Sequence, residues 1–214
     1  MLLGELGPDG YTGLWNGRTD WKSSPVTAAL ETFTKVLAVS DLASAAGDWQ
    51  PAIDKVMSGV VAYNIMGDWV DAYLARSRNL KYRTDYEVVT APGTSGVYNF
   101  LSDSFTLPKG APHRASAEKW LIVCGSVNGQ DAFNPLKGSV PARIDADRSK
   151  YQDYLASAMT DWLDPHIRVV GCLTHGVVAG NRWNEQIDKA LAQFVQDSDT
   201  ARFVDAVVAH ASFR

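Results

Sequence analysis

The chain has 214 residues, 46% of them hydrophobic and 10% aromatic, and its 20 basic against 24 acidic residues leave a formal net charge of −4. This apolar content suffices for a packed core and excludes intrinsic disorder as the main state. No basic block occurs, so the electrostatic signature of a nucleic-acid-binding protein is missing and we expect no nucleic-acid partner. No apolar run reaches the ~20 residues that a membrane span needs.

Hydrophobic periodicity and turn residues predict helices that alternate with short strands. In chain order we expect helices over 24–37 and 49–57, a buried strand over 60–65, a helix over 69–76, a strand over 86–90 and a β-rich stretch over 97–107. Helices over 116–124, 130–133, 149–162, 182–196 and 200–211 follow, with a break over 165–180. This alternation predicts the α/β class.

The N-terminal segment 1–8 has neither a basic region nor a sustained apolar stretch, so we do not expect it to be a signal peptide. Cys124 and Cys172 form no CxxC or Cys/His metal pattern, and the four histidines show no metal-ligand spacing. The nucleotide-binding glycine motifs, GxSxG and HExxH are absent as well. We therefore expect no metal site, no cofactor and no catalytic residues.

Four polar or aromatic residues stand at predicted element junctions. Trp69 follows a predicted strand, where open α/β sheets bind ligands, and an aromatic ring there can stack on the apolar face of a sugar. Asp103 interrupts an apolar stretch, Lys137 lies in a predicted loop, and His175 lies in the break between helices. Each also has an ordinary structural interpretation: a core tryptophan, a solvated aspartate or lysine, and a hydrogen-bonded structural histidine.

A glycosidase is the enzymatic alternative. Glycosidases use two carboxyl groups ~5–9.5 Å apart, and Asp161 and Asp164 could supply them. Acidic residues three apart on a helix are more often a solvated face, so we expect no enzymatic activity.

Three segments, taken in order, resemble one family. Residues 62–69 (AYNIMGDW), residues 97–110 (VYNFLSDSFTLPKG) and above all residues 129–143 (GQDAFNPLKGSVPAR) are similar to the extracellular solute-binding proteins of ABC sugar importers. The third segment resembles the glucose/mannose-binding branch, and His175-Gly176 falls where that branch has its His-Gly pair.

The resemblance implies a function without chemistry. Trp69 would stack on a hexose, and Asp103, Lys137 and His175 would hydrogen-bond its hydroxyls. Two lobes would close on the monosaccharide and present it to an ABC permease, outside the cell or in the periplasm. The implied fold is the periplasmic-binding-protein-like II fold.

The resemblance also implies that the chain is truncated. Family members are about twice as long, so this chain would hold C-terminal-lobe segments over 1–101 and 141–214 and an excursion of the N-terminal lobe over 102–140. The excursion would leave Trp120, Leu121 and Phe133 uncovered, and we expect a homodimer formed by strand or segment exchange. A disulfide between Cys124 and Cys172 would lock the lobes, so we expect free thiols. A fold that has lost its ligand and acts as a dimeric interaction module is the alternative function.

Overall fold

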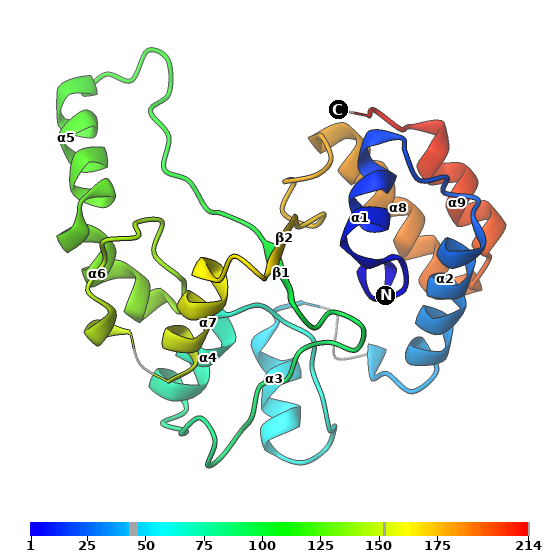
Figure 1. Cartoon of the computed structure of the whole chain (residues 1–214), viewed down its shortest axis with the longest axis horizontal. Coiled ribbons are helices and arrows are strands. Elements are labelled where there is room, and N and C mark those ends of the chain that lie inside the picture. The colour runs from blue at the N-terminus through cyan, green and yellow to red at the C-terminus, as the bar shows by residue number, and fades with distance from the viewer. Residues whose placement is uncertain (43–46, 152, 214) are drawn as a thin grey trace. The chain divides into compact units, whose positions relative to one another are not determined.

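The computed structural model describes residues 1–42, 47–151 and 153–213 and is mainly helical (Figure 1). Its α-helices are α1 Leu2–Asn16, α2 Ser24–Leu37, α3 Gln50–Met57, α4 Trp69–Ala72, α5 Arg114–Gly125, α6 Val127–Lys137, α7 Asp153–Leu163, α8 Asn181–Asp197 and α9 Thr200–Ala209. A π-helical turn, Tyr73–Ser77, continues α4, and a 3-10 turn, Arg148–Lys150, precedes α7. In the described part of the chain, no helix has both the length and the apolar character to cross a membrane.

The strands β1 Val97–Phe100 and β2 Arg168–Gly171 form a parallel two-stranded sheet. Val97 pairs with Arg168 and Phe100 with Gly171, and the Cys172 amide extends the ladder by donating to the Phe100 carbonyl at 2.7 Å. A parallel sheet among helices agrees with the expected α/β class. β2 lies in the segment 165–180, where the sequence predicts no element.

Contacts divide the chain into two compact units. Unit 1 consists of Met1–Ala52, Thr90–Ser102 and Pro165–Arg214, and unit 2 consists of Ile53–Val89 and Asp103–Asp164. In unit 1, α1 packs on α2 and β2, and α9 packs on α8 and α2 (Figure 1). In unit 2, α6 packs on both α4 and α5.

Unit 1 has an aromatic core. The Trp15 ring meets the rings of Trp21 and Trp183 edge to face, with centroids 5.3 and 5.7 Å apart. The buried Trp183 indole satisfies its N–H by donating to the Val207 carbonyl at 2.9 Å, which ties α8 to α9. Edge-to-face aromatic pairs add roughly 0.5–1.5 kcal/mol each beyond their buried area, so this cluster stabilises unit 1.

Unit 2 has a much smaller apolar core. Its buried hydrophobic cluster consists of Ala146, Tyr151, Leu155 and Met159 among the described residues. Leu155 and Met159 lie one turn apart on α7, so one face of that helix supplies half of the cluster. Polar contacts must therefore carry much of the order in unit 2.

Most predicted helices are confirmed, and the differences have local causes. α1 is not predicted because Gly7 and Pro8 read as a turn; Gly7 takes a left-handed φ of 67° and kinks the helix, and Pro8 restarts it. α6 is longer than its predicted range 130–133, because Pro135 is accommodated in its last turn. α7 begins at Asp153, after a 3-10 turn, rather than at the predicted residue 149.

Two predicted strands are wrong. Residues 60–65 and 86–90 form no strand, and Val60, Tyr63, Ile65 and Val89 are exposed. Near the second segment, Tyr86 pairs with Tyr82 in an isolated β-bridge. An apolar run makes a strand only where a neighbouring strand accepts its hydrogen bonds, and the described chain offers none to these segments. The β-rich stretch 97–107 is confirmed only as far as Phe100, where β1 ends.

Candidate functional site

Three of the predicted binding residues lie in unit 2. Trp69 is the first residue of α4, Lys137 is the last residue of α6, and Asp103 precedes the exposed segment that leads to α5. The Lys137 ammonium donates to the Asp103 carboxylate at 2.9 Å. A cation at the end of α6 also faces the negative end of the helix dipole, which favours the lysine at this position.

α4 and α6 meet closely at the end that carries Lys137. Gly138 ends α6 with a left-handed φ of 80°, and a Cβ built there would lie 2.7 Å from the Ala72 Cβ and 3.1 Å from the Trp69 Cα. The Arg76 guanidinium donates twice to the Pro135 carbonyl, at 3.1 and 3.3 Å. The backbones at Trp69 and Lys137 are thus held together by a glycine contact and an arginine clamp.

The Trp69 ring is positioned by the two residues before it. A Cβ at Gly67 would overlap the six-membered ring, so glycine lets the half-buried indole lie against the backbone. Asp68 stands at the N-cap of α4 and accepts a hydrogen bond from the Tyr154 hydroxyl at 2.6 Å. Gly67 therefore fixes the side on which the ring lies, and Asp68 ties the start of α4 to Tyr154 on α7.

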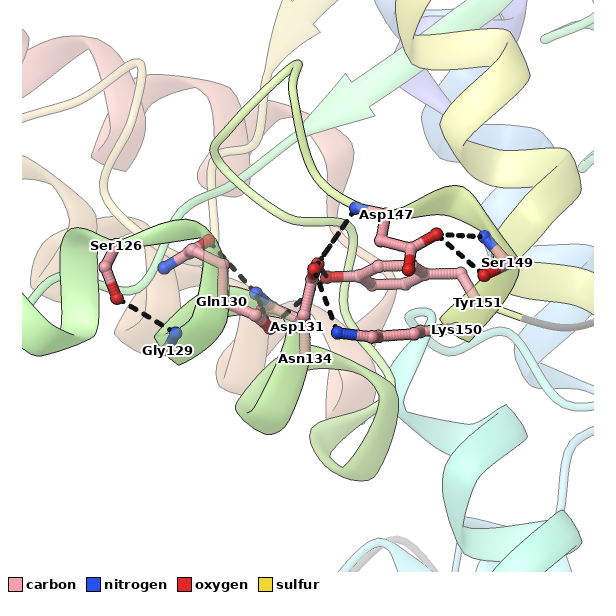
Figure 2. Close-up of polar contacts among 9 residues, drawn as sticks. All are labelled: Ser126, Gly129, Gln130, Asp131, Asn134, Asp147, Ser149, Lys150 and Tyr151. Carbon is pink, nitrogen blue, oxygen red and sulfur yellow. Dashed lines mark hydrogen bonds and ion pairs between the residues drawn. The ribbon is translucent and has the colours of Figure 1, made fainter.

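A buried carboxylate anchors α6 to the segment that follows it (Figure 2). Asp131, whose side chain is 1% exposed, accepts from the Asp147 amide at 3.2 Å and the Tyr151 hydroxyl at 3.1 Å, and it pairs with Lys150 at 3.5 Å. Burial and the neighbouring Asp131 raise the pKa of Tyr151, so the phenol stays a donor. Asp147 in turn caps the 3-10 turn by accepting from the Ser149 amide.

Two amide side chains complete this support. Gln130 donates to the Cys124 carbonyl at 2.7 Å and accepts from the Ala142 amide at 2.9 Å, which links the end of α5 to the loop after α6. The buried Asn134 donates to Gln130 and accepts from the Ser139 hydroxyl at 2.7 Å. These bonds hold the last turn of α6, and with it Lys137, in one position.

A second buried acid, Asp71, lies two residues after Trp69. Asp71 accepts from the Tyr86 hydroxyl at 2.5 Å. Burial raises the pKa of Asp71 above its usual value, the Tyr86 hydrogen bond opposes that shift, and the nearby Asp153 and Asp68 add to it. Burial and Asp71 raise the pKa of Tyr86 in turn.

The fourth predicted residue, His175, lies in unit 1 in the turn after β2. Its imidazole Nδ1 is 3.5 Å from the Cys172 thiol, and Gly176 closes the turn with a left-handed φ of 72°. The structure therefore pairs Asp103 with Lys137 in unit 2 and places the Trp69 backbone beside the end of α6, whereas His175 belongs to unit 1. Cys172 belongs to unit 1 and Cys124 to unit 2, and both are half-buried.

The cluster in unit 2 has the chemistry of a site for a neutral polyol. An aromatic face can cover C–H groups, a carboxylate accepts from hydroxyls, and an ammonium donates to them. The ion pair is partly solvated, with Asp103 65% and Lys137 31% exposed, so it contributes little to stability and its groups can exchange one partner for another. The charges of the Asp103 carboxylate and the Lys137 ammonium cancel, so the pair has no net charge and suits an uncharged ligand.

Neither metal binding nor acid–base catalysis gains support from the described residues. His, Cys, Asp and Glu side chains there form no group of three or more that could hold a metal ion. Asp161 and Asp164, the candidate glycosidase pair, are exposed at the end of α7.

Sequence reasoning missed the residues that support this cluster: Arg76, Gln130, Asp131, Asn134 and Tyr154. The available signal was a carboxylate and an amide on the same short helix as Lys137, within the segment 129–143 that carries the family resemblance most strongly. Their burial could not be inferred from periodicity, because polar residues are placed on the solvent face by default.

The chain is similar to several solute-binding proteins. It is 28% identical over 97% of its length to an ABC transporter extracellular-binding protein of Pyrococcus horikoshii, of which it covers 46%. It is 32% identical over 77% of its length to a xylose/arabinose-binding protein of Haloferax volcanii, and 30% identical over 68% to a probable sugar-binding periplasmic protein of Mesorhizobium japonicum. It covers 36% and 35% of these two relatives.

No protein-family model matches the chain. The chain spans about half, or less, of the length of the curated relatives it matches. Most of its sequence is nevertheless similar to an ABC transporter extracellular-binding protein, and more than two thirds of it is similar to sugar-binding proteins.

Proposed function

We propose that this chain binds a monosaccharide as part of the solute-binding component of an ABC transporter, outside the cell or in the periplasm. The observation that carries the proposal is the Asp103–Lys137 pair beside the start of α4, where Trp69 stands. The names of the similar proteins, which are binding proteins rather than enzymes, support binding without catalysis. The fold we propose is the periplasmic-binding-protein-like II fold, and the partner that receives the sugar is an ABC permease.

We further propose a hexose of the glucose/mannose type as the ligand. The resemblance of residues 129–143 to the glucose/mannose-binding branch supports this choice. The name of the Haloferax relative, a xylose/arabinose-binding protein, makes pentoses the competing class. We propose His175 as a fourth ligand that hydrogen-bonds a sugar hydroxyl.

Isothermal titration calorimetry tests the proposal. The chain is titrated with D-glucose, D-mannose, D-galactose, D-xylose and L-arabinose. Because the chain spans about half the length of its relatives, we expect a dissociation constant weaker than micromolar, of order 0.1–1 mM. Lys137→Met is expected to weaken binding at least about 10-fold, which corresponds to one lost charge-assisted hydrogen bond. Lys189→Met, which changes an exposed lysine on α8, is the matched control and is expected to bind as the parent does. Equal loss in both variants would contradict the assignment of Lys137.

A second candidate function is a dimeric interaction module without a ligand. The exposed aromatic side chains on α5 and α6 favour it. Failure of every sugar to produce heat or to raise the melting temperature, together with a stable dimer, would support this candidate over the first.

A further inference from the structure

Unit 2 exposes a cluster of large apolar side chains outside the Trp69 site. The α5–α6 face consists of Phe105, Trp120, Val123, Phe133 and Leu136. Their exposed fractions are 52%, 52%, 59%, 46% and 60%. None of the residues of α5 is buried, although that helix carries Trp120, Leu121, Ile122 and Val123 in succession. Trp120 and Phe133 are thus uncovered, as the sequence predicts, and Leu121 is half-buried.

The face is one connected and ordered surface. The Phe105 ring meets Trp120 edge to face with centroids 4.8 Å apart, and it meets Phe133 with centroids 6.0 Å apart. Val123 follows Trp120 and Leu136 follows Phe133 at three-residue spacing, so each lies beside its aromatic neighbour on the same helix face. Rings held against one another lose little further freedom on binding, which favours association.

The size of the face fits one half of a symmetric interface. An aromatic side chain buries roughly 150–250 Å², so three at about half exposure leave roughly 200–400 Å² of apolar area. Val123 and Leu136 raise the total to roughly 300–500 Å². A standard interface buries about 800 Å² per partner, of which about 65% is apolar in homodimers. The α5–α6 face therefore supplies most of the apolar area that a stable dimer needs.

The charge of the face favours a second copy as the occupant. On a twofold axis each surface meets itself, so a charge at the centre would meet a like charge. The five side chains of the face are uncharged, and Arg114 and Glu118 pair on α5 at 2.8 Å. Lys119, directly before Trp120, is the remaining charged residue of α5. Unit 2 also has only a small apolar core, so covering this face adds markedly to its buried apolar surface.

We propose that the α5–α6 face is a self-association surface on which two copies of this chain pack around a twofold axis. Sedimentation velocity at micromolar concentration tests this with the parent chain and two variants on different helices, Trp120→Glu and Leu136→Glu. The parent is expected to sediment as a dimer, and each variant to raise the dimer dissociation constant at least about 30-fold. Val39→Glu places the same charge on an exposed valine of unit 1, and this control is expected to remain dimeric. Circular dichroism confirms that each variant is folded.

A monomeric parent chain, an open-ended assembly, or a dimer that both variants leave intact would overturn the proposal. A parent chain that does not self-associate through the α5–α6 face, but binds a different protein there, would also overturn the proposal.

The two thiols give a measurement that needs no substitution. Cys124 lies one helical turn after Trp120, beside the proposed interface, whereas Cys172 lies in unit 1. Alkylation by iodoacetamide, mapped by peptide mass spectrometry, gives the ratio of the Cys124 rate to the Cys172 rate. We expect this ratio to be lower in concentrated protein than in diluted protein. A ratio that does not change with protein concentration would contradict burial of Cys124 at a dimer interface.

Discussion

Asp131 offers the sharpest test of how unit 2 holds its candidate site. Substitution to alanine removes the acceptor of two donors, the Tyr151 hydroxyl and the Asp147 amide, at 3.1 and 3.2 Å. Tyr151 is 2% exposed, so its hydroxyl has no ready access to water. The hydroxyl keeps a second acceptor, the Gln130 carbonyl at 3.2 Å, so the Asp147 amide is the donor that loses its side-chain acceptor. The cost of a buried donor without an acceptor is about 1–3 kcal/mol, so we expect Asp131→Ala to lower the free energy of unfolding by about 1–3 kcal/mol.

Asp131→Asn separates charge from hydrogen bonding. The amide keeps one acceptor oxygen and loses the other, so we expect a loss of about 1–2 kcal/mol. Asp161→Ala, which removes an exposed carboxylate from α7, is the control and should change stability by less than about 0.5 kcal/mol.

Urea unfolding followed by circular dichroism measures these changes, and amide hydrogen exchange shows whether they are confined to α6 and its neighbours. If Asp131→Ala and Asp161→Ala unfold within about 0.5 kcal/mol of each other, the network does not stabilise unit 2 and the reasoning is wrong.

Three further predictions concern the same unit. Gly138→Ala would place a Cβ 2.7 Å from the Ala72 Cβ on a residue whose φ is left-handed at 80°. We expect this substitution to lower the free energy of unfolding in urea by about 2 kcal/mol or more. An unchanged urea midpoint would contradict the close contact of α4 with α6. Burial raises the pKa of Asp71 in the folded chain above the value of about 3.9 that it has in the unfolded chain. The Asp71 carboxylate therefore lowers the free energy of unfolding at a pH above the folded-state pKa, and it does not change this free energy at a pH below the unfolded-state pKa. Asp71→Asn should therefore raise the free energy of unfolding near pH 7, and the gain should disappear toward about pH 3.5; a gain of equal size at both pH values would refute the assigned cause. Lys137→Met should change stability by less than about 1 kcal/mol, because its partner Asp103 is well exposed, and a larger loss in urea unfolding would assign the pair a structural role.

Helices whose apolar residues form one continuous stripe were predictable from the sequence. α8 shows this best, because Ile187, Ala190 and Phe194 recur at helical spacing and all three are buried. α1 was not predictable in the same way, because Gly7 and Pro8 interrupt its pattern while the packed aromatic core keeps the helix continuous. Tertiary packing thus overrides a local helix-breaking signal.

Strands were predicted less well, because a strand is defined by its neighbour. Residues 60–65 have the apolar composition of a buried strand, yet Tyr63 and Ile65 are exposed and belong to no β-strand. β2 pairs with β1 and carries the β-branched residues Val169 and Val170, a local signal that the predicted break over 165–180 overlooked. Which strand pairs with which is not visible in local sequence when the two segments lie far apart in the chain.

The candidate site was predictable as a set of residue types but not as a geometry. Asp103 and Lys137 were singled out from their positions in the sequence and from a family resemblance, and the structure adds that they form an ion pair. The supporting carboxylate of Asp131 could not be found by pattern, because its burial depends on donors from a later loop. His175 stays a predicted ligand of the proposed site.

Calorimetric titration of the parent chain with D-glucose and D-mannose, with Trp69→Ala measured beside it, tests the proposed sugar binding most directly. We expect saturable binding with a dissociation constant of order 0.1–1 mM that the tryptophan substitution weakens at least about 10-fold. Absence of binding heat for either hexose at about 10 mM, or binding that is unchanged in Trp69→Ala, would contradict it.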